Sequence, residues 1–67
     1  MKKIIIEISD EQHTKMIEHI QKGQKLNLDN ETFSGFGIRL NNCELGDWLE
    51  IHMYGELDLG DVNWKIE

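Results

Sequence analysis

The first residues of the chain alternate between apolar and polar positions in the way that is typical of a β-strand. Ile4, Ile6 and Ile8 stand at every second position, and the segment is rich in β-branched side chains. Ile5 falls on the opposite face of the same strand. We therefore expect a strand over residues 2–8 that is covered on both sides, either at the centre of its sheet or at a dimer contact.

A helix is predicted directly after this strand. Ser9 can cap the first free amides, and Gln12 can reach back to the Ser9 amide, which together form a capping box. We expect the helix to run to about Lys22 and to end at Gly23, because glycine readily adopts the left-handed conformation of a C-cap. The apolar stripe is narrow and favours a helix that lies on a sheet; it consists of Met16, Ile17 and Ile20.

Three later segments alternate as strands do, namely residues 32–40, 47–54 and 57–66. Asn41-Asn42 suits the turn between the first two, since asparagine tolerates left-handed backbone conformations. Gly35 and Gly37 thin one face of the first segment, which favours a bulge or the close approach of another backbone. In the last segment the apolar residues shift from odd to even positions near Gly60, which indicates a β-bulge or a short loop.

The predicted order is β-α-β-β-β, an α+β fold of two layers in a single domain over residues 1–67. One helix packs on one face of a four-stranded, mostly antiparallel sheet. Because one helix cannot cover both faces, the other face must be polar, self-associated or bound to a partner. The predicted core consists of Ile4, Ile6, Ile8, Met16, Ile17, Ile20, Phe36, Ile38, Leu49, Ile51 and Met53.

All of the net charge lies in the last 25 residues. Residues 1–42 hold six acidic and six basic side chains, whereas residues 43–67 hold seven acidic side chains and one base, Lys65, which gives the net charge of −6. An acidic surface suits a basic protein partner. The scattered Lys and Arg residues argue against direct binding to nucleic acid or to an anionic membrane.

Aromatic residues stand within this acidic stretch. The alternation over residues 47–54 puts Trp and Tyr side chains, which often anchor interfaces, on one side of a strand. The predicted partner-binding set comprises Glu44, Asp47, Trp48, Glu50, His52, Tyr54, Asp58, Asp61 and Trp64. Two alternatives stay open: the aromatic residues cover each other by cross-strand pairing, and the acids serve local turns.

No segment carries a specific catalytic, metal-binding or nucleotide-binding signature. Cys43 has only His52 as a candidate base. Asp58 and Asp61 lack the ligand spacing of an EF-hand, and the phosphate-loop pattern is absent around Gly35. We therefore expect no enzyme, no cofactor and no metal; an enzyme built from Cys43 and His52 across a dimer is the weakest alternative.

We expect a cytoplasmic protein. Glu7 interrupts the apolar run that a signal peptide needs, and no stretch approaches the roughly 20 apolar residues of a membrane span. A single cysteine, Cys43, excludes an internal disulfide.

In size, charge and layout the chain resembles phage-encoded inhibitors of host defence and immunity-type inhibitors. This resemblance matches no motif, and no family is recognised. From the acidic and aromatic residues we expect a bacterial protein of a phage or mobile element that occludes a basic, nucleic-acid-handling protein, with its acidic row as a mimic of nucleic acid. The alternative is a self-associating structural module such as a homodimer, since a chain of 67 residues is only marginally stable alone.

Overall fold

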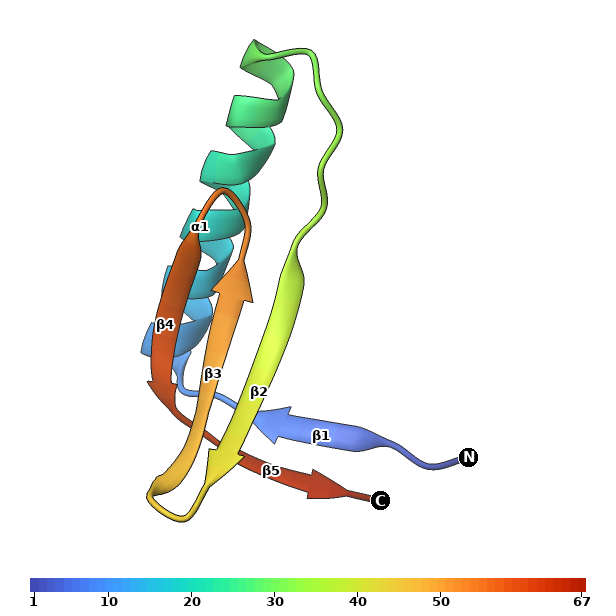
Figure 1. Ribbon diagram of the computed structural model, residues 1–67, viewed down its shortest axis with the longest axis vertical. Coiled ribbons are helices and arrows are strands. Elements are labelled where there is room, and N and C mark those ends of the chain that lie inside the picture. Colours follow the sequence, from blue (N-terminus) through green and yellow to red (C-terminus); the bar gives the residue numbers. More distant parts are fainter.

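The computed structural model describes residues 1–67 and confirms an α+β fold with a single helix (Figure 1). In chain order the elements are β1 (Ile4–Glu7), α1 (Asp10–Asp29), β2 (Gly37–Cys43), β3 (Gly46–His52), β4 (Glu56–Asp61) and β5 (Asn63–Ile66). They form a three-stranded antiparallel sheet in the order β2-β3-β4 and a two-stranded antiparallel pair, β1-β5. The last segment thus holds two strands, which gives five strands rather than four.

The core lies between α1 and one face of β3 and β4. Leu49 and Ile51 of β3, Leu59 of β4 and Val62 after it are buried in one cluster. Partly buried side chains surround the cluster: Ile6, Ile8, Met16, Ile20, Leu40 and Leu57. Only 6 of the 67 residues are buried, so the core is small even for this length. Three residues of the predicted core, Ile4, Phe36 and Ile38, are instead largely exposed, because they lie beyond the area that α1 covers.

The helix begins where the capping box predicts. Ser9 Oγ accepts a hydrogen bond from the Gln12 amide at 3.1 Å, and the Ser9 amide donates to Gln12 Oε1 at 2.8 Å. Gln12 Nε2 also donates to the backbone carbonyls of Leu59 at 2.9 Å and Asp61 at 2.8 Å. One side chain therefore caps the helix and ties it to the end of β4.

The predicted end of the helix at Gly23 is wrong, because α1 continues to Asp29. Gly23 is buried, and a Cβ at this position would overlap the sulfur of Met53. Close packing against Met53 therefore explains this glycine, and no left-handed cap is needed. The turn follows at Asn30 and Glu31, and Glu31 has φ of 52°. The helix does not combine the length and apolarity that a membrane crossing requires.

Strand β2 begins and ends later than the pattern predicts. Asn41 and Asn42 were expected in a turn, but they pair with Trp48 and Asp47 inside the β2-β3 ladder. Their side-chain amides donate to the carboxylates of Glu50 and Asp47, so these asparagines are satisfied within the sheet. The turn lies at residues 44–45, and residues 32–36 remain outside any strand.

The irregularity expected near Gly60 is present. Leu49 pairs with Gly60 whereas Glu50 pairs with Asp58, so Leu59 is an extra residue in β4. Gly60 has φ of 87°, a value that favours glycine. This bulge turns Leu59 into the core and keeps Asp58 and Asp61 on the other face.

Strands β1 and β5, which we call the arm, extend away from the three-stranded sheet (Figure 1). Ile4 pairs with Ile66 and Ile6 with Trp64, and Lys3 and Glu67 exchange backbone hydrogen bonds of 2.6 and 2.8 Å. β1 was expected either at the centre of its sheet or at a dimer contact; it is not central, because β5 is its only neighbouring strand. The arm makes the molecule long and thin, with extents of 40 × 27 × 21 Å.

Candidate protein-binding surface

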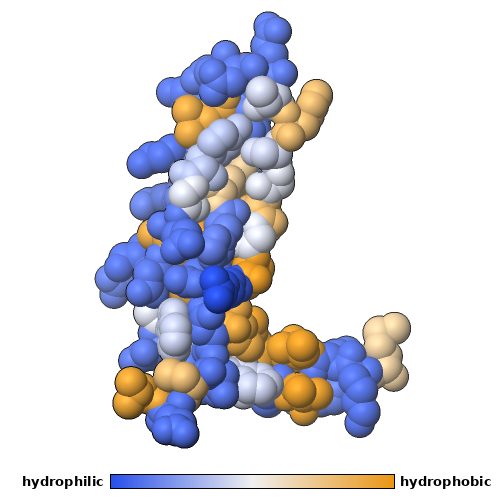
Figure 2. Space-filling model, viewed as in Figure 1, coloured by the Kyte–Doolittle hydropathy of each residue, from blue (hydrophilic) through white to orange (hydrophobic).

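The face of the β2-β3-β4 sheet opposite α1 has no element packed on it. Residues that pair directly across antiparallel strands point to the same side of a sheet. Trp48, Glu50 and His52 of β3 share this side with their partners on β4, which are Asp61, Asp58 and Glu56 respectively. We call these six residues the acidic face. Figure 2 views the molecule from this side, and hydrophilic residues cover most of the sheet.

Glu50 lies at the centre of the acidic face and is held by its neighbours. Its Oε1 accepts a hydrogen bond from Asn41 Nδ2 at 3.0 Å and lies 4.0 Å from Arg39 Nε. His52 Nε2 lies 3.7 Å from the same oxygen. The side chain of Glu50 is only 18% exposed, so its orientation is fixed and part of its charge is offset within the chain.

His52 stands between two carboxylates. Its Nδ1 lies 3.7 Å from Glu56 Oε1, while Nε2 is buried without a hydrogen-bond partner. Ligand atoms of Glu50, His52 and Glu56 all lie within 4.8 Å of one another, which is close enough for one cation. Because Asn41 and Arg39 already engage the Glu50 oxygen, we interpret the three residues as an ion-pair network that forms when His52 is protonated.

The outer row of the acidic face, on β4, is exposed. Asp58 Oδ1 accepts a hydrogen bond of 2.8 Å from the Gly60 amide, so the predicted turn role of this acid is real. Neither Asp58 nor Asp61 forms an ion pair with any Lys, Arg or His of the chain. These two charges are therefore free to meet basic groups of another molecule.

The other residues of the predicted set lie elsewhere. Glu44 is in the β2-β3 turn, and Asp47 accepts a hydrogen bond from Asn42 Nδ2. Trp64 is in β5, on the face of the arm that carries Ile6. The structure thus brings together five of the nine predicted residues, namely Trp48, Glu50, His52, Asp58 and Asp61.

Tyr54 leaves the acidic face because β3 ends at His52. Tyr54 has φ of 51°, and its hydroxyl donates a hydrogen bond to Asn27 Oδ1 near the end of α1 and is hydrogen-bonded to Thr32 Oγ1 in the segment after the helix. The neighbouring hydroxyls of Ser34 and then Thr32 hold the pKa of Tyr54 below its usual value of 10.0. This tyrosine therefore serves a polar cluster that joins α1 to the segment before β2.

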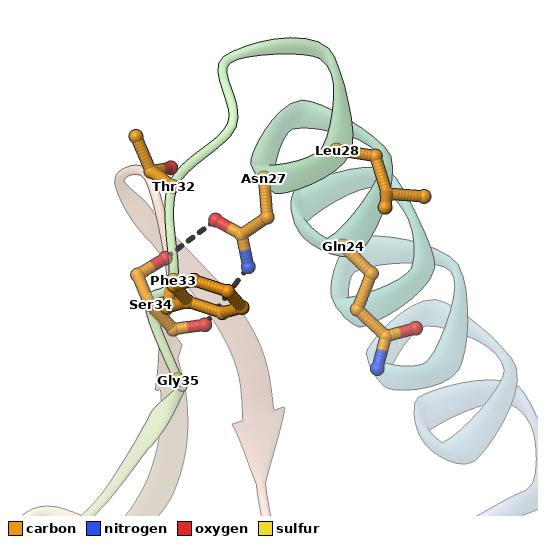
Figure 3. Close-up of a pocket in the computed structure, with 7 residues that line it drawn as sticks. All are labelled: Gln24, Asn27, Leu28, Thr32, Phe33, Ser34 and Gly35. Atoms are coloured by element: carbon orange, nitrogen blue, oxygen red, sulfur yellow. Dashed lines mark hydrogen bonds between the residues drawn. The ribbon is translucent and has the colours of Figure 1, made fainter.

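That cluster borders a shallow hollow between the end of α1 and residues 32–35 (Figure 3). Asn27 Nδ2 donates to the Ser34 carbonyl and Ser34 Oγ donates to Asn27 Oδ1, each at 2.9 Å. The polar groups thus satisfy one another, and Leu28 and Phe33 remain 80% and 102% exposed. No local pattern marks Asn27 in the sequence, because its partners come from outside the helix.

Three residues that form or support the acidic face were not predicted from the sequence. Glu56 stands two positions before Asp58, so the period of a strand could have placed both on one side. Arg39 and Asn41 required the true register of β2, which the expected turn at Asn41 obscured.

Cys43 and His52 do not form a pair. Cys43 faces Gly46 at one end of the β2-β3 ladder and His52 faces Gly37 at the other. The thiol is exposed, and its sulfur accepts a hydrogen bond from the Leu45 amide at 3.4 Å. The arrangement offers no base beside the thiol.

No protein-family model matches this chain, and no curated protein or solved structure is significantly similar to it.

Proposed function

We propose that this chain is a small acidic binding protein that covers and blocks a basic surface of a nucleic-acid-handling protein. The observation that supports this most is the pair of exposed acids Asp58 and Asp61, which have no basic partner within the chain and share a face with Trp48. Arginine or lysine side chains of a partner would complete charge-assisted hydrogen bonds with them. Trp48, partly buried beside them, would supply the apolar contact that anchors an interface.

The distribution of charge along the chain supports the same proposal. The net charge of −6 arises from residues 43–67, and the acidic face belongs to this part. A row of carboxylates on one strand presents negative charge to a protein groove as a nucleic-acid backbone does, and accelerates association with a basic protein. The proposal places the protein in the bacterial cytoplasm, encoded by a phage or mobile element and without catalytic activity; the exposed thiol of Cys43 suits a reducing compartment.

A pair of variants with the same charge tests the proposal. One variant, Glu56→Gln/Asp58→Asn/Asp61→Asn, neutralises the outer row, and the amide introduced at position 58 keeps a side-chain oxygen for the Gly60 amide. The control, Glu7→Gln/Glu18→Gln/Asp29→Asn, neutralises three exposed acids away from the acidic face. Each immobilised protein is exposed to bacterial lysate, and retained proteins are released by increasing salt.

We expect wild type and control to retain the same basic protein and the outer-row variant to lose it. High salt should release the partner, because ion pairs at exposed sites are screened. Double-stranded DNA should compete with wild type for the purified partner. Equal retention by all three proteins, or no retained protein at all, would contradict the proposal.

A further inference from the structure

The chain exposes more surface than a folded protein of its size should. Its accessible surface is 5395 Å², whereas the size relation for folded monomers gives about 4,400 Å² for 7.9 kDa. Its radius of gyration is 13.6 Å against about 11 Å expected for 67 residues. The excess of about 1,000 Å² is comparable to the roughly 800 Å² that each partner buries in a standard protein interface.

Much of the excess surface is apolar and continues the side of the strands that packs against the core. Ile38 pairs with the buried Ile51, so it points to the helix side of the sheet, yet it is 53% exposed. On the arm, Ile4 and Ile66 continue the face of Ile6, which packs against the core, and they are 67% and 61% exposed. The apolar layer thus continues past α1 in two directions without cover.

These two exposed parts lie on the same side of the molecule. The arm points beyond β2, towards the side where β2 has no neighbouring strand (Figure 1). Hydrophobic residues gather along that side and in the corner between sheet and arm (Figure 2). A body that docks on the free edge of β2 therefore also meets the apolar face of the arm.

The free edge of β2 is open to backbone pairing. Alternate residues of an edge strand present unpaired N–H and C=O groups, and proteins commonly protect such edges with charge. β2 carries one charged residue, Arg39, in its seven residues. A Cβ at Gly37 or at Gly35 would meet nothing within 4 Å, so no contact within the chain requires these glycines. Both features suit the close approach of another strand.

We infer that a second copy of this chain occupies this surface. The two β2 strands pair antiparallel about a twofold axis to form one six-stranded sheet, and each arm packs its apolar face on the other copy. The strands that meet carry few charges, namely Glu7 of β1, Arg39 of β2 and Lys65 of β5, so repulsion between the two copies is small there. The acidic face lies on the other side of the sheet, and its outer row is on the far strand, β4, so both remain accessible in the dimer.

Sedimentation equilibrium of the full chain from micromolar to near-millimolar concentration tests this inference. We expect a reversible transition from 7.9 kDa to twice that mass. Added salt should leave the dimer intact or strengthen it, because the interface is apolar and salt screens repulsion between two acidic chains.

Three lysine substitutions locate the interface. Ile38→Lys on β2 and Ile66→Lys on the arm should each raise the dissociation constant of the dimer about tenfold or more. Leu45→Lys is the matched control, since Leu45 is 98% exposed in the β2-β3 turn and outside the proposed interface. Circular dichroism at low concentration checks that each variant keeps its helix. Where a variant does not fold, sedimentation equilibrium of the wild-type chain still tests whether the dimer forms.

A wild-type chain that stays monomeric throughout, or that assembles beyond a dimer, would overturn the inference. An equal loss of association in Leu45→Lys would overturn the assignment of the interface. The outer-row variant Glu56→Gln/Asp58→Asn/Asp61→Asn should still dimerise. Dimerisation without a basic partner would thus refute only the proposed function, and a monomer that retains such a partner would refute only the dimer.

Discussion

The two edge strands of the sheet, β4 and β2, differ in how they are protected from pairing with another chain. β4 packs against α1, turns Leu59 into the core and carries three acids on its outer face. β2 has no helix over it, and of its seven residues only Leu40 and Asn41 are partly buried. Charge and helix protect β4 from pairing with another chain. The contrast indicates that the stability of the monomer resides around β3 and β4. In the proposed dimer, β2 is the strand that contacts the second copy.

The largest expected effect contrasts two isoleucines that face each other across β2 and β3. Ile51 is 0% exposed and Ile38 is 53% exposed. Ile51→Ala should lower the free energy of unfolding by about 2–5 kcal/mol, because it leaves a cavity in the core. Ile38→Ala should cost below about 1 kcal/mol in dilute solution. Denaturant unfolding measures both losses of free energy. Equal losses for the two variants would mean that β2 and β3 are equally covered, and would contradict the contrast between a covered and an uncovered strand.

Gln12 is expected to have the next largest effect, since it ties α1 to the β4 side. Gln12→Glu keeps an acceptor for the Ser9 amide but replaces the donor to the Leu59 and Asp61 carbonyls with a carboxylate. We expect a loss of about 1–3 kcal/mol in the free energy of unfolding, measured with denaturant. Ser9→Ala, which removes only the cap, should cost about 1 kcal/mol. Equal losses for the two variants would mean that the tie to β4 contributes nothing.

Substitution of Gly23 tests the close contact between α1 and Met53 on the covered side of the sheet. In wild type, Gly23→Ala should destabilise by about 1 kcal/mol, since overlap with Met53 exceeds the gain in helix propensity. In a Met53→Ala background the same substitution should become stabilising. Gly35→Ala on the uncovered side is the control and should not depend on Met53. Thermal melting of six proteins checks the sign: wild type and Met53→Ala, each alone, with Gly23→Ala and with Gly35→Ala. An unchanged sign for Gly23→Ala would contradict the contact.

Tyr54 should show the smallest effect. Because its pKa is lower in the folded than in the unfolded state, the folded chain binds fewer protons between the two values, and stability should rise with pH across that window. Ser34→Ala should move the pKa back towards 10.0, which absorbance of the single tyrosinate reports. An unchanged titration curve would contradict the role assigned to Ser34, whereas Ser9→Ala should leave the curve as in wild type.

Local signals predicted the start of the helix correctly but not its end. The capping box needs only Ser9 and Gln12, which lie within four consecutive positions, so the sequence contains all of its partners. Gly23 has the sequence context of a cap, but Met53, thirty residues later, determines its role. Asn41 was misplaced for the same reason, because its amide is satisfied by Glu50 on the next strand.

The acidic face was partly predictable because a strand has a fixed period. That period places Trp48, Glu50 and His52 on one side of β3. The change of apolar residues from odd to even positions near Gly60 predicted the bulge that keeps Asp58 and Asp61 on one face. Tyr54 and Trp64 were misplaced because the chain leaves the sheet at two points, after His52 and at Val62. Where a strand ends depends on tertiary contacts, which alternation alone does not contain.

Amide hydrogen exchange at several protein concentrations tests the contrast between the two edges most directly. We expect amides of β3 and of the helix to be protected at every concentration. Amides on the free edge of β2 and in the arm should exchange quickly in dilute solution and slow down as the concentration rises. Exchange in β2 and the arm that is independent of concentration would contradict the account.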